Sequence, residues 1–259
     1  MVPNRTPPGS VRGQVDLVRV LGWHEPRWRD VEGIADGSSG GVGRATRRVL
    51  EATGRSISPF DLAEGLDLRD FGEVIEAMHG GVEVVHAGAI AHDSTGIPAE
   101  IVATNVLGTW HVLLAAVQLG VSRVVYFSSG QVFCFAEGEG EPAYLPVDDN
   151  HPIMASRPYG MSKRLAEEMC SAWTRRTGIP TIVLRPVMIL DDEGLRSVSH
   201  EAAELGAFVH AEDVASAVQL SLAVDVEGHH RLTLCGPGPF DTSVANALLG
   251  GKHPGVAGT

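Results

Sequence analysis

The chain has 259 residues, of which 44% are hydrophobic, and its formal net charge is -12. It is long and apolar enough to bury one sizeable core. Nucleic acids and anionic membranes attract clustered Lys and Arg, so this charge argues against both partners and favours a small-molecule substrate. The three cysteines, Cys134, Cys170 and Cys235, have no CxxC spacing. They indicate neither a disulfide framework nor a metal site, and we expect a cytoplasmic protein.

Residues 1–30 are expected to form a poorly ordered N-terminal extension. They contain four prolines, and no apolar run long enough for a signal peptide or a membrane span follows their arginines. Within this segment, Val15–Leu21 could nevertheless pair as a strand.

From Val31 onward, short apolar runs alternate with longer amphipathic segments, which is the pattern of βα units around a parallel sheet. The fold class that it predicts is α/β, a Rossmann-type doubly wound parallel sheet. We expect one domain over 31–259, with a small, shortened C-terminal substrate lobe at about 187–207 and 223–259. The predicted strands are Val31–Ala35, Ser56–Phe60, Val82–His86, Arg123–Phe127, Thr181–Leu184 and Arg231–Leu234. The predicted helices are Val42–Thr53, Phe71–Met78, Ala99–Leu119, Pro158–Thr177 and Ala211–Leu222.

A glycine-rich loop lies between the first predicted strand and the first predicted helix. Glycine lets the backbone turn tightly and lets a pyrophosphate approach the positive end of the helix. The loop therefore predicts a dinucleotide-binding site, although an ordinary flexible turn would have the same glycines. The residues expected to contact the cofactor here are Gly37, Gly40, Gly41, Val42 and Gly43.

Acidic residues follow the second predicted strand. Asp61 is placed to accept hydrogen bonds from ribose hydroxyls, and it would repel a 2′-phosphate, so we expect NAD rather than NADP. Asp67 could accept from the amino group of adenine while Leu68 covers the ring. Each of these residues could instead belong to a turn or to the start of a helix.

Tyr159 and Lys163 are four residues apart in a predicted helix, so both side chains lie on one face. A nearby ammonium favours the ionised form of a phenol, which makes Tyr159 a candidate proton acceptor for a substrate hydroxyl. Ser129 follows the strand Arg123–Phe127 and could polarise the substrate oxygen. Taken alone, the Tyr-Lys pair could be an ordinary surface pair. We expect the buried stripe of this helix to consist of Met161, Leu165, Met169 and Trp173.

In this order, the motifs resemble those of the short-chain dehydrogenase/reductase superfamily, and specifically its extended branch, the NAD-dependent epimerase/dehydratase family. Further matching stretches are Val84–Ala89, Asn105–Thr109, Val124–Ser129, Leu184–Pro186 and Phe208–Val214. The resemblance implies a Rossmann fold that binds NAD(P), with Tyr159 as acid/base, Lys163 as its partner and Ser129 orienting the substrate. It also places Ala87 beside the cofactor and Asn105 behind the site.

The same resemblance implies a sugar-like substrate, such as a sugar acid or a nucleotide sugar, and the chain length is closest to uronate dehydrogenase-like members. It further implies a homodimer that associates through the helices Ala99–Leu119 and Pro158–Thr177.

Our leading hypothesis is an NAD-dependent oxidoreductase or epimerase. The segment Val31–Asp36 is a weak first strand that puts a charge beside the glycine loop, and only 21 residues separate Pro186 from Phe208, where the substrate pocket is expected. These departures motivate two alternatives. One is a non-catalytic dinucleotide-binding sensor or scaffold, and the other is a chain with a damaged first strand and a marginal fold.

Overall fold

The computed structural model describes residues 17–21, 41–54, 56–60, 67–133, 141–144, 147–197 and 208–235. For 17–21, 41–44 and 56–60 it describes the backbone alone. All structural statements below refer to these residues.

The described strands form a parallel sheet of six with the order β2-β1-β3-β4-β5-β8. β2 lies on one side of β1 and β3 on the other, so the order in which strands are added reverses at β1. The carboxyl ends of β1 and β3 therefore flank the crevice in which doubly wound folds bind ligands. The predicted doubly wound parallel fold is therefore confirmed. The strands are β1 (Leu17–Leu21), β2 (Ser56–Phe60), β3 (Glu83–His86), β4 (Arg123–Phe127), β5 (Thr181–Pro186) and β8 (His229–Leu234). A separate parallel pair consists of β6 (Met188–Leu190) and β7 (Phe208–His210).

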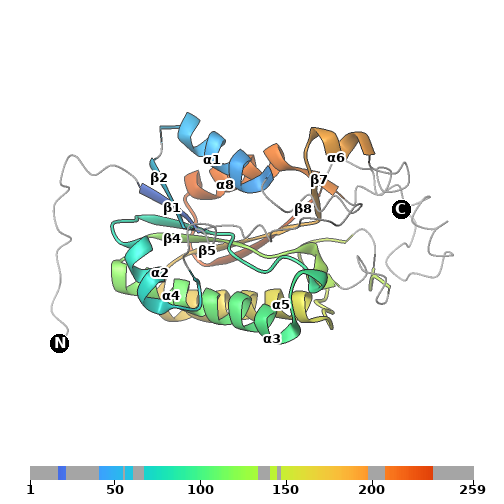
Figure 1. Ribbon diagram of the computed structural model, residues 1–259, viewed down its shortest axis with the longest axis horizontal. Helices are drawn as coiled ribbons and strands as arrows, with labels where there is room; N and C mark the ends of the chain where they lie inside the picture. Colours follow the sequence, from blue (N-terminus) through green and yellow to red (C-terminus); the bar gives the residue numbers. More distant parts are fainter. Residues whose placement is uncertain are drawn as a thin grey trace.

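Helices cover both faces of the sheet (Figure 1). On one face lie α1 (Gly41–Ala52) and α8 (Ala211–Ala223), and on the other lie α2 (Phe71–Met78), α3 (Pro98–Val102), α4 (Gly108–Leu119) and α5 (Pro158–Thr177). The short helix α6 (Asp192–Ser197) follows β6. Strand residues alternate between the two core layers: Val84 packs with α2 and α4, whereas Val85 packs with α1 and α8. This alternation is the reason that central strands need apolar residues at consecutive positions.

The first strand lies earlier in the chain than Val31–Ala35, where the sequence predicts it. The structure places Leu17–Leu21 between β2 and β3, with Val18 in register with both Ile57 and Glu83. The strand expected as an alternative within Val15–Leu21 is thus present at Leu17–Leu21, and the rest of residues 1–30 lies outside the described residues. A central strand needs a nearly continuous apolar run, which LVRVL supplies and the Glu- and Gly-containing 31–35 does not. Residues 31–35 lie outside the described residues.

The predicted helix Ala99–Leu119 is divided into three parts. Pro98 opens α3, a π-helical turn follows at Ala103–Leu107, and α4 ends at Gly120 in the left-handed conformation with φ of 71°. By length and composition, Pro98–Leu119 is apolar enough to cross a membrane. Ile101 and Val112 are buried in the fold, however, and core helices of globular proteins pass the same test.

The predicted stripe of α5 is buried only in its second half, where Trp173 is buried and Met169 packs against the same core cluster. Met161 and Leu165 are 43% and 45% exposed, whereas Lys163, Glu167 and other residues on the opposite side are buried. Both sides of α5 carry apolar residues, so periodicity alone did not identify the inward face. The charged residues on that face are buried because they find partners on β4 and β5, as described below.

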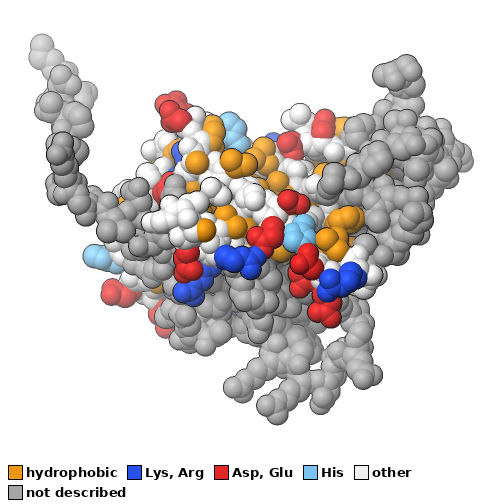
Figure 2. Space-filling model, turned by 90° about the horizontal axis from the view of Figure 1, so that it is seen from above, with side chains coloured by type: hydrophobic (Ala, Val, Ile, Leu, Met, Phe, Trp, Pro, Cys, Tyr) orange, Lys and Arg blue, Asp and Glu red, His pale blue; other side chains and the backbone are white. Residues whose placement is uncertain are grey.

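Figure 2 views the molecule from the side of α1 and α8. On the described surface in this view, acidic and basic side chains lie close to one another and are interspersed with apolar ones. The described residues include no group of three or more His, Cys, Asp or Glu that could hold a metal ion.

Candidate active site

Three of the predicted site residues lie together at the carboxyl end of β4. Lys163 Nζ donates a 2.8 Å hydrogen bond to the carbonyl oxygen of Phe127, the last residue of β4 and two residues before Ser129. The same nitrogen lies 5.7 Å from the centre of the Tyr159 ring. The parallel sheet and α5 thus bring Ser129, Tyr159 and Lys163 to one edge, as the sequence predicts.

The environment of Lys163 is unusual for an ammonium group. Burial lowers the pKa of Lys163 to about 7, and the nearby Glu167 carboxylate opposes that shift. Its Nζ also lies 5.2 Å from the centre of the Tyr126 ring, where the negative face of an aromatic ring attracts a cation. A cation held this close to a phenol favours ionisation of the phenol, which is the property that a proton-accepting Tyr159 needs.

Asn105 connects the loop after β3 to the first turn of α5. Its amide group accepts from Ile90 N (2.8 Å) and donates to Ser162 Oγ (2.9 Å). Ser162 Oγ in turn donates to the carbonyl oxygen of Tyr159 (2.7 Å). Asn105 therefore lies behind Tyr159 and fixes the turn that carries it, in agreement with the position that the resemblance implied.

Asp93 anchors the beginning of α5. Its Oδ1 accepts a 2.8 Å hydrogen bond from the backbone N–H of Tyr159, one of the groups that a helix leaves without a partner in its first turn. The other oxygen, Oδ2, is buried and has no hydrogen-bond partner among the described residues. Sequence reasoning missed Asp93, because only the fold brings the loop after β3 to this helix.

A buried ion pair lies beneath the site. Arg185 on β5 donates from Nε and from a terminal nitrogen to the two oxygens of Glu167 on α5, at 2.9 and 2.6 Å. Ser128 Oγ donates to the same carboxylate at 2.5 Å. The pair connects α5, β5 and the end of β4. Its sequence signals were an arginine inside the apolar run TIVLRP and a glutamate four residues after Lys163.

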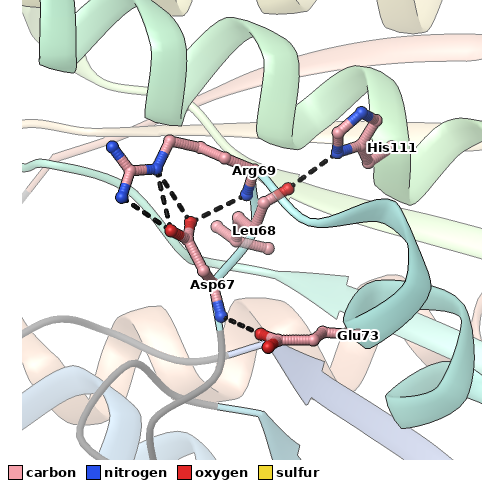
Figure 3. A network of polar contacts seen from close by, with 5 residues as sticks. All are labelled: Asp67, Leu68, Arg69, Glu73 and His111. Carbon is pink, nitrogen blue, oxygen red and sulfur yellow. Dashed lines mark hydrogen bonds and ion pairs between the residues drawn. The ribbon is translucent and has the colours of Figure 1, made fainter.

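The residues predicted to contact adenine form a polar network at the start of α2 (Figure 3). Asp67 is ion-paired with Arg69, with the closest contact at 2.6 Å. The side chain of Leu68 packs in the core cluster of α2 and α4, so its expected role in covering the adenine ring stays a prediction.

The structure describes only some of the other residues that are predicted to contact the cofactor. Ala87 follows β3 and is buried, and Gly41, Val42 and Gly43 form the start of α1. Gly37, Gly40 and Asp61 lie outside the described residues.

Two observations fit a bound dinucleotide. The first turn of α1 contains no acidic residue that would oppose a pyrophosphate. An ammonium has three N–H donors, and among the described residues Lys163 Nζ has a single hydrogen-bond acceptor, the oxygen of Phe127. The two remaining donors suit the hydroxyls of a ribose.

A model of the NAD-dependent epimerase/dehydratase family matches residues 36–190, which is more than half of the chain. The chain belongs to this family. The family resemblance that the motifs indicated is thereby confirmed.

Two curated family relatives illustrate the similarity. A uronate dehydrogenase from Pseudomonas syringae pv. tomato is 29% identical over 164 residues, which cover 59% of this chain and 57% of the relative. A putative UDP-glucose 4-epimerase from Methanocaldococcus jannaschii is 42% identical over 81 residues, covering 31% of this chain and 25% of the relative. The chain therefore matches at most about 57% of the length of these relatives.

Solved structures show the same fold. A short-chain dehydrogenase/reductase superfamily protein from Agrobacterium tumefaciens, solved with bound NAD, has a TM-score of 0.66 and 25% identity, and the match covers 90% of this chain and 83% of that one. A glucuronic acid dehydrogenase from Chromohalobacter salexigens has a TM-score of 0.68 at 18% identity, covering 91% and 83% of the two chains.

Proposed function

We propose that the protein binds NAD and transfers a hydride between this cofactor and a hydroxyl or carbonyl carbon of a sugar-like substrate. The observation that carries the proposal is the position of Lys163, buried between the Tyr159 ring and the end of β4, two residues before Ser129. Relatives named uronate dehydrogenase and UDP-glucose 4-epimerase support a sugar acid or a nucleotide sugar as the substrate.

In the proposed reaction, the Tyr159 phenol accepts the proton of the substrate hydroxyl, and the charge that this requires is stabilised by the Lys163 ammonium. The Ser129 hydroxyl donates to the substrate oxygen and holds it beside Tyr159. When bound, NAD supplies the hydride acceptor, and the protein contributes orientation and proton transfer.

The proposed cofactor contacts extend along the carboxyl edge of the sheet. Lys163 donates to ribose hydroxyls through the N–H groups that Phe127 does not occupy. The N-terminus of α1 faces the pyrophosphate, since unpaired N–H groups and the helix dipole favour an anion there. Asp61 favours NAD over NADP by repelling a 2′-phosphate.

A substrate panel tests the proposed reaction. Sugar acids and nucleotide sugars are incubated with the purified chain and NAD, and the products are followed by NADH absorbance and by chromatography of the sugars. We expect NADH formation or an epimerised sugar with at least one compound. A panel without either product would contradict the proposal and favour the non-catalytic alternative.

We further propose that the protein is a homodimer. Exposed apolar side chains on α4 and α5 occur at Trp110, Val117, Met161 and Leu165. Both helices lie on the same face of the sheet, so their side chains can contribute to one interface that is apolar at its centre. Light scattering should give twice the chain mass of 27.4 kDa, and a monomer at micromolar concentration would contradict this proposal.

A further inference from the structure

The first turn of α5 carries Tyr159 but receives no cap from the residue that precedes the helix. Arg157 is the N-cap residue, and its side chain makes no capping hydrogen bond. A guanidinium has only donors, so arginine cannot bind the free N–H groups of a helix start. Pro158, the first helical residue, has no N–H. The first N–H of α5 that needs an acceptor from outside the helix is therefore that of Tyr159 itself.

Asp93 supplies this acceptor from a position 66 residues away in the sequence, through the 2.8 Å hydrogen bond from the N–H of Tyr159 to its Oδ1. A carboxylate is favoured at the positive end of a helix, and a charged acceptor makes a hydrogen bond roughly twice as strong as a neutral one. A cap from the neighbouring residue would stabilise the helix alone. A cap from another loop also determines where Tyr159 lies relative to that loop.

The loop that carries Asp93 is itself held in place. Ile90 exchanges two hydrogen bonds with the side-chain amide of Asn105: its N–H donates at 2.8 Å and its oxygen accepts at 3.0 Å. His92 caps the short 3-10 helix that begins at Asp93. Asp93 thus holds Tyr159 against a loop whose own conformation is defined by hydrogen bonds.

The backbone oxygen of Tyr159 is connected to the same loop. It accepts a 2.7 Å hydrogen bond from Ser162 Oγ, to which the amide of Asn105 donates at 2.9 Å. Because Asn105 also binds Ile90, the N–H and the oxygen of Tyr159 are both linked to the loop after β3. The phenol is carried on this backbone, and a displacement of about 1 Å in an active site can lower a rate by about a hundredfold.

The Asp93 carboxylate has a second feature that capping alone does not explain. Its Oδ2 is buried and has no hydrogen-bond partner among the described residues. A buried acceptor without a partner destabilises a fold, and serine caps helices about as well without burying a second oxygen. Departures of this kind from the rules of stability are expected at functional sites.

We propose that Asp93 is a positioning residue for the reaction, which sets the place of the Tyr159 phenol by holding the Tyr159 N–H against the loop after β3. The inference rests on the proposed function, because it requires that Tyr159 be the acid/base. Asp93 does not touch the reacting atoms and acts only through the backbone of Tyr159.

The test measures kcat at saturating NAD and saturating substrate, with a compound that the wild-type protein converts. Asp93→Ala should lower kcat by about tenfold to a hundredfold, since it frees the turn that carries the phenol. KM and the dissociation constant for NAD should stay within about twofold, because ground-state binding is not affected. Asp93→Asn should recover most of the loss and stay about twofold to fivefold below wild type, because its amide oxygen accepts the same hydrogen bond without the charge.

Asp70→Ala is the matched control. Asp70 caps α2 in the same way, with its Oδ1 accepting from the N–H of Glu73 at 3.1 Å. Loss of either cap should lower the melting temperature by about 2–4 °C. Only Asp93→Ala should lower kcat, because α2 does not carry Tyr159.

The outcomes separate positioning from stability. If Asp93→Ala has the same kcat as Asp70→Ala, whether both are normal or both are reduced, the inference alone is overturned and Asp93 is an ordinary helix cap. Asp93→Asn keeps an acceptor for the helix and decides the question if the alanine variant does not fold: a kcat equal to that of wild type would then contradict the inference. A wild-type chain that converts no compound of the panel overturns the proposed function together with the inference.

Discussion

Tyr159→Phe should reduce turnover of any substrate that the wild-type protein accepts by about 10²- to 10⁴-fold, the usual contribution of a positioned acid/base. The substitution removes only the phenolic oxygen and keeps the ring, which is 7% exposed and packed in the fold. The hydrogen bond from the Tyr159 N–H to Asp93 is also unaffected. The dissociation constant for NAD should therefore stay within about twofold of the wild-type value, since the loss is confined to the transition state.

Tyr144→Phe provides the control for this experiment. It removes the same atom from a tyrosine whose hydroxyl donates to Asp148 at 2.6 Å. We expect normal turnover. If Tyr159→Phe retained more than about a tenth of the wild-type rate, Tyr159 would not be the proton acceptor.

Arg185→Met should destabilise the protein by about 3–5 kcal/mol, because it leaves the Glu167 carboxylate buried without its counter-charge. Both side chains are almost completely inaccessible to solvent, so water cannot replace the lost partner. Ser128 would remain as a donor to the carboxylate and Lys163 as a nearby cation, but neither replaces the paired contact that Arg185 makes with both oxygens. Urea denaturation of the purified chain measures the change in the free energy of unfolding.

The double variant Arg185→Met/Glu167→Met separates loss of the pair from loss of packing. Because it buries no charge, it should be less destabilised than Arg185→Met alone, so that the two substitutions are clearly non-additive. Arg175→Met, at an exposed position, should stay within about 0.5 kcal/mol of wild type. Equal stability of Arg185→Met and wild type, or simple additivity in the double variant, would show that the pair is not the buried unit described above.

How far the sequence predicts this fold depends on the position of each element. β3, β4 and β5 lie in the centre of the sheet, and their apolar runs identify them directly. The strand that pairs between β2 and β3 is Leu17–Leu21, whereas the glycine loop favours a first strand at the residues just before it, Val31–Ala35, which lie outside the described residues.

The site shows the same division. Tyr159, Lys163 and Ser129 are recognisable because the roles proposed for them depend on helix spacing and on a strand end, both of which are local features. Glu167 and Asp93 were missed, because each acts through a partner distant in sequence: Arg185 for the first and the N-terminus of α5 for the second. Met161 and Leu165, the two exposed members of the predicted stripe on α5, have the same explanation, since burial of Lys163 in place of them depends on the Phe127 carbonyl, which only the folded chain supplies.

The most direct test of the central claim is calorimetric titration of the purified full chain with NAD and, separately, with NADP. The proposed site predicts saturable binding of NAD and clearly weaker binding of NADP, because Asp61 is expected to repel the 2′-phosphate. A chain that bound neither dinucleotide would contradict the claim that this sheet edge, with α1, Asp67 and Lys163, forms a cofactor site.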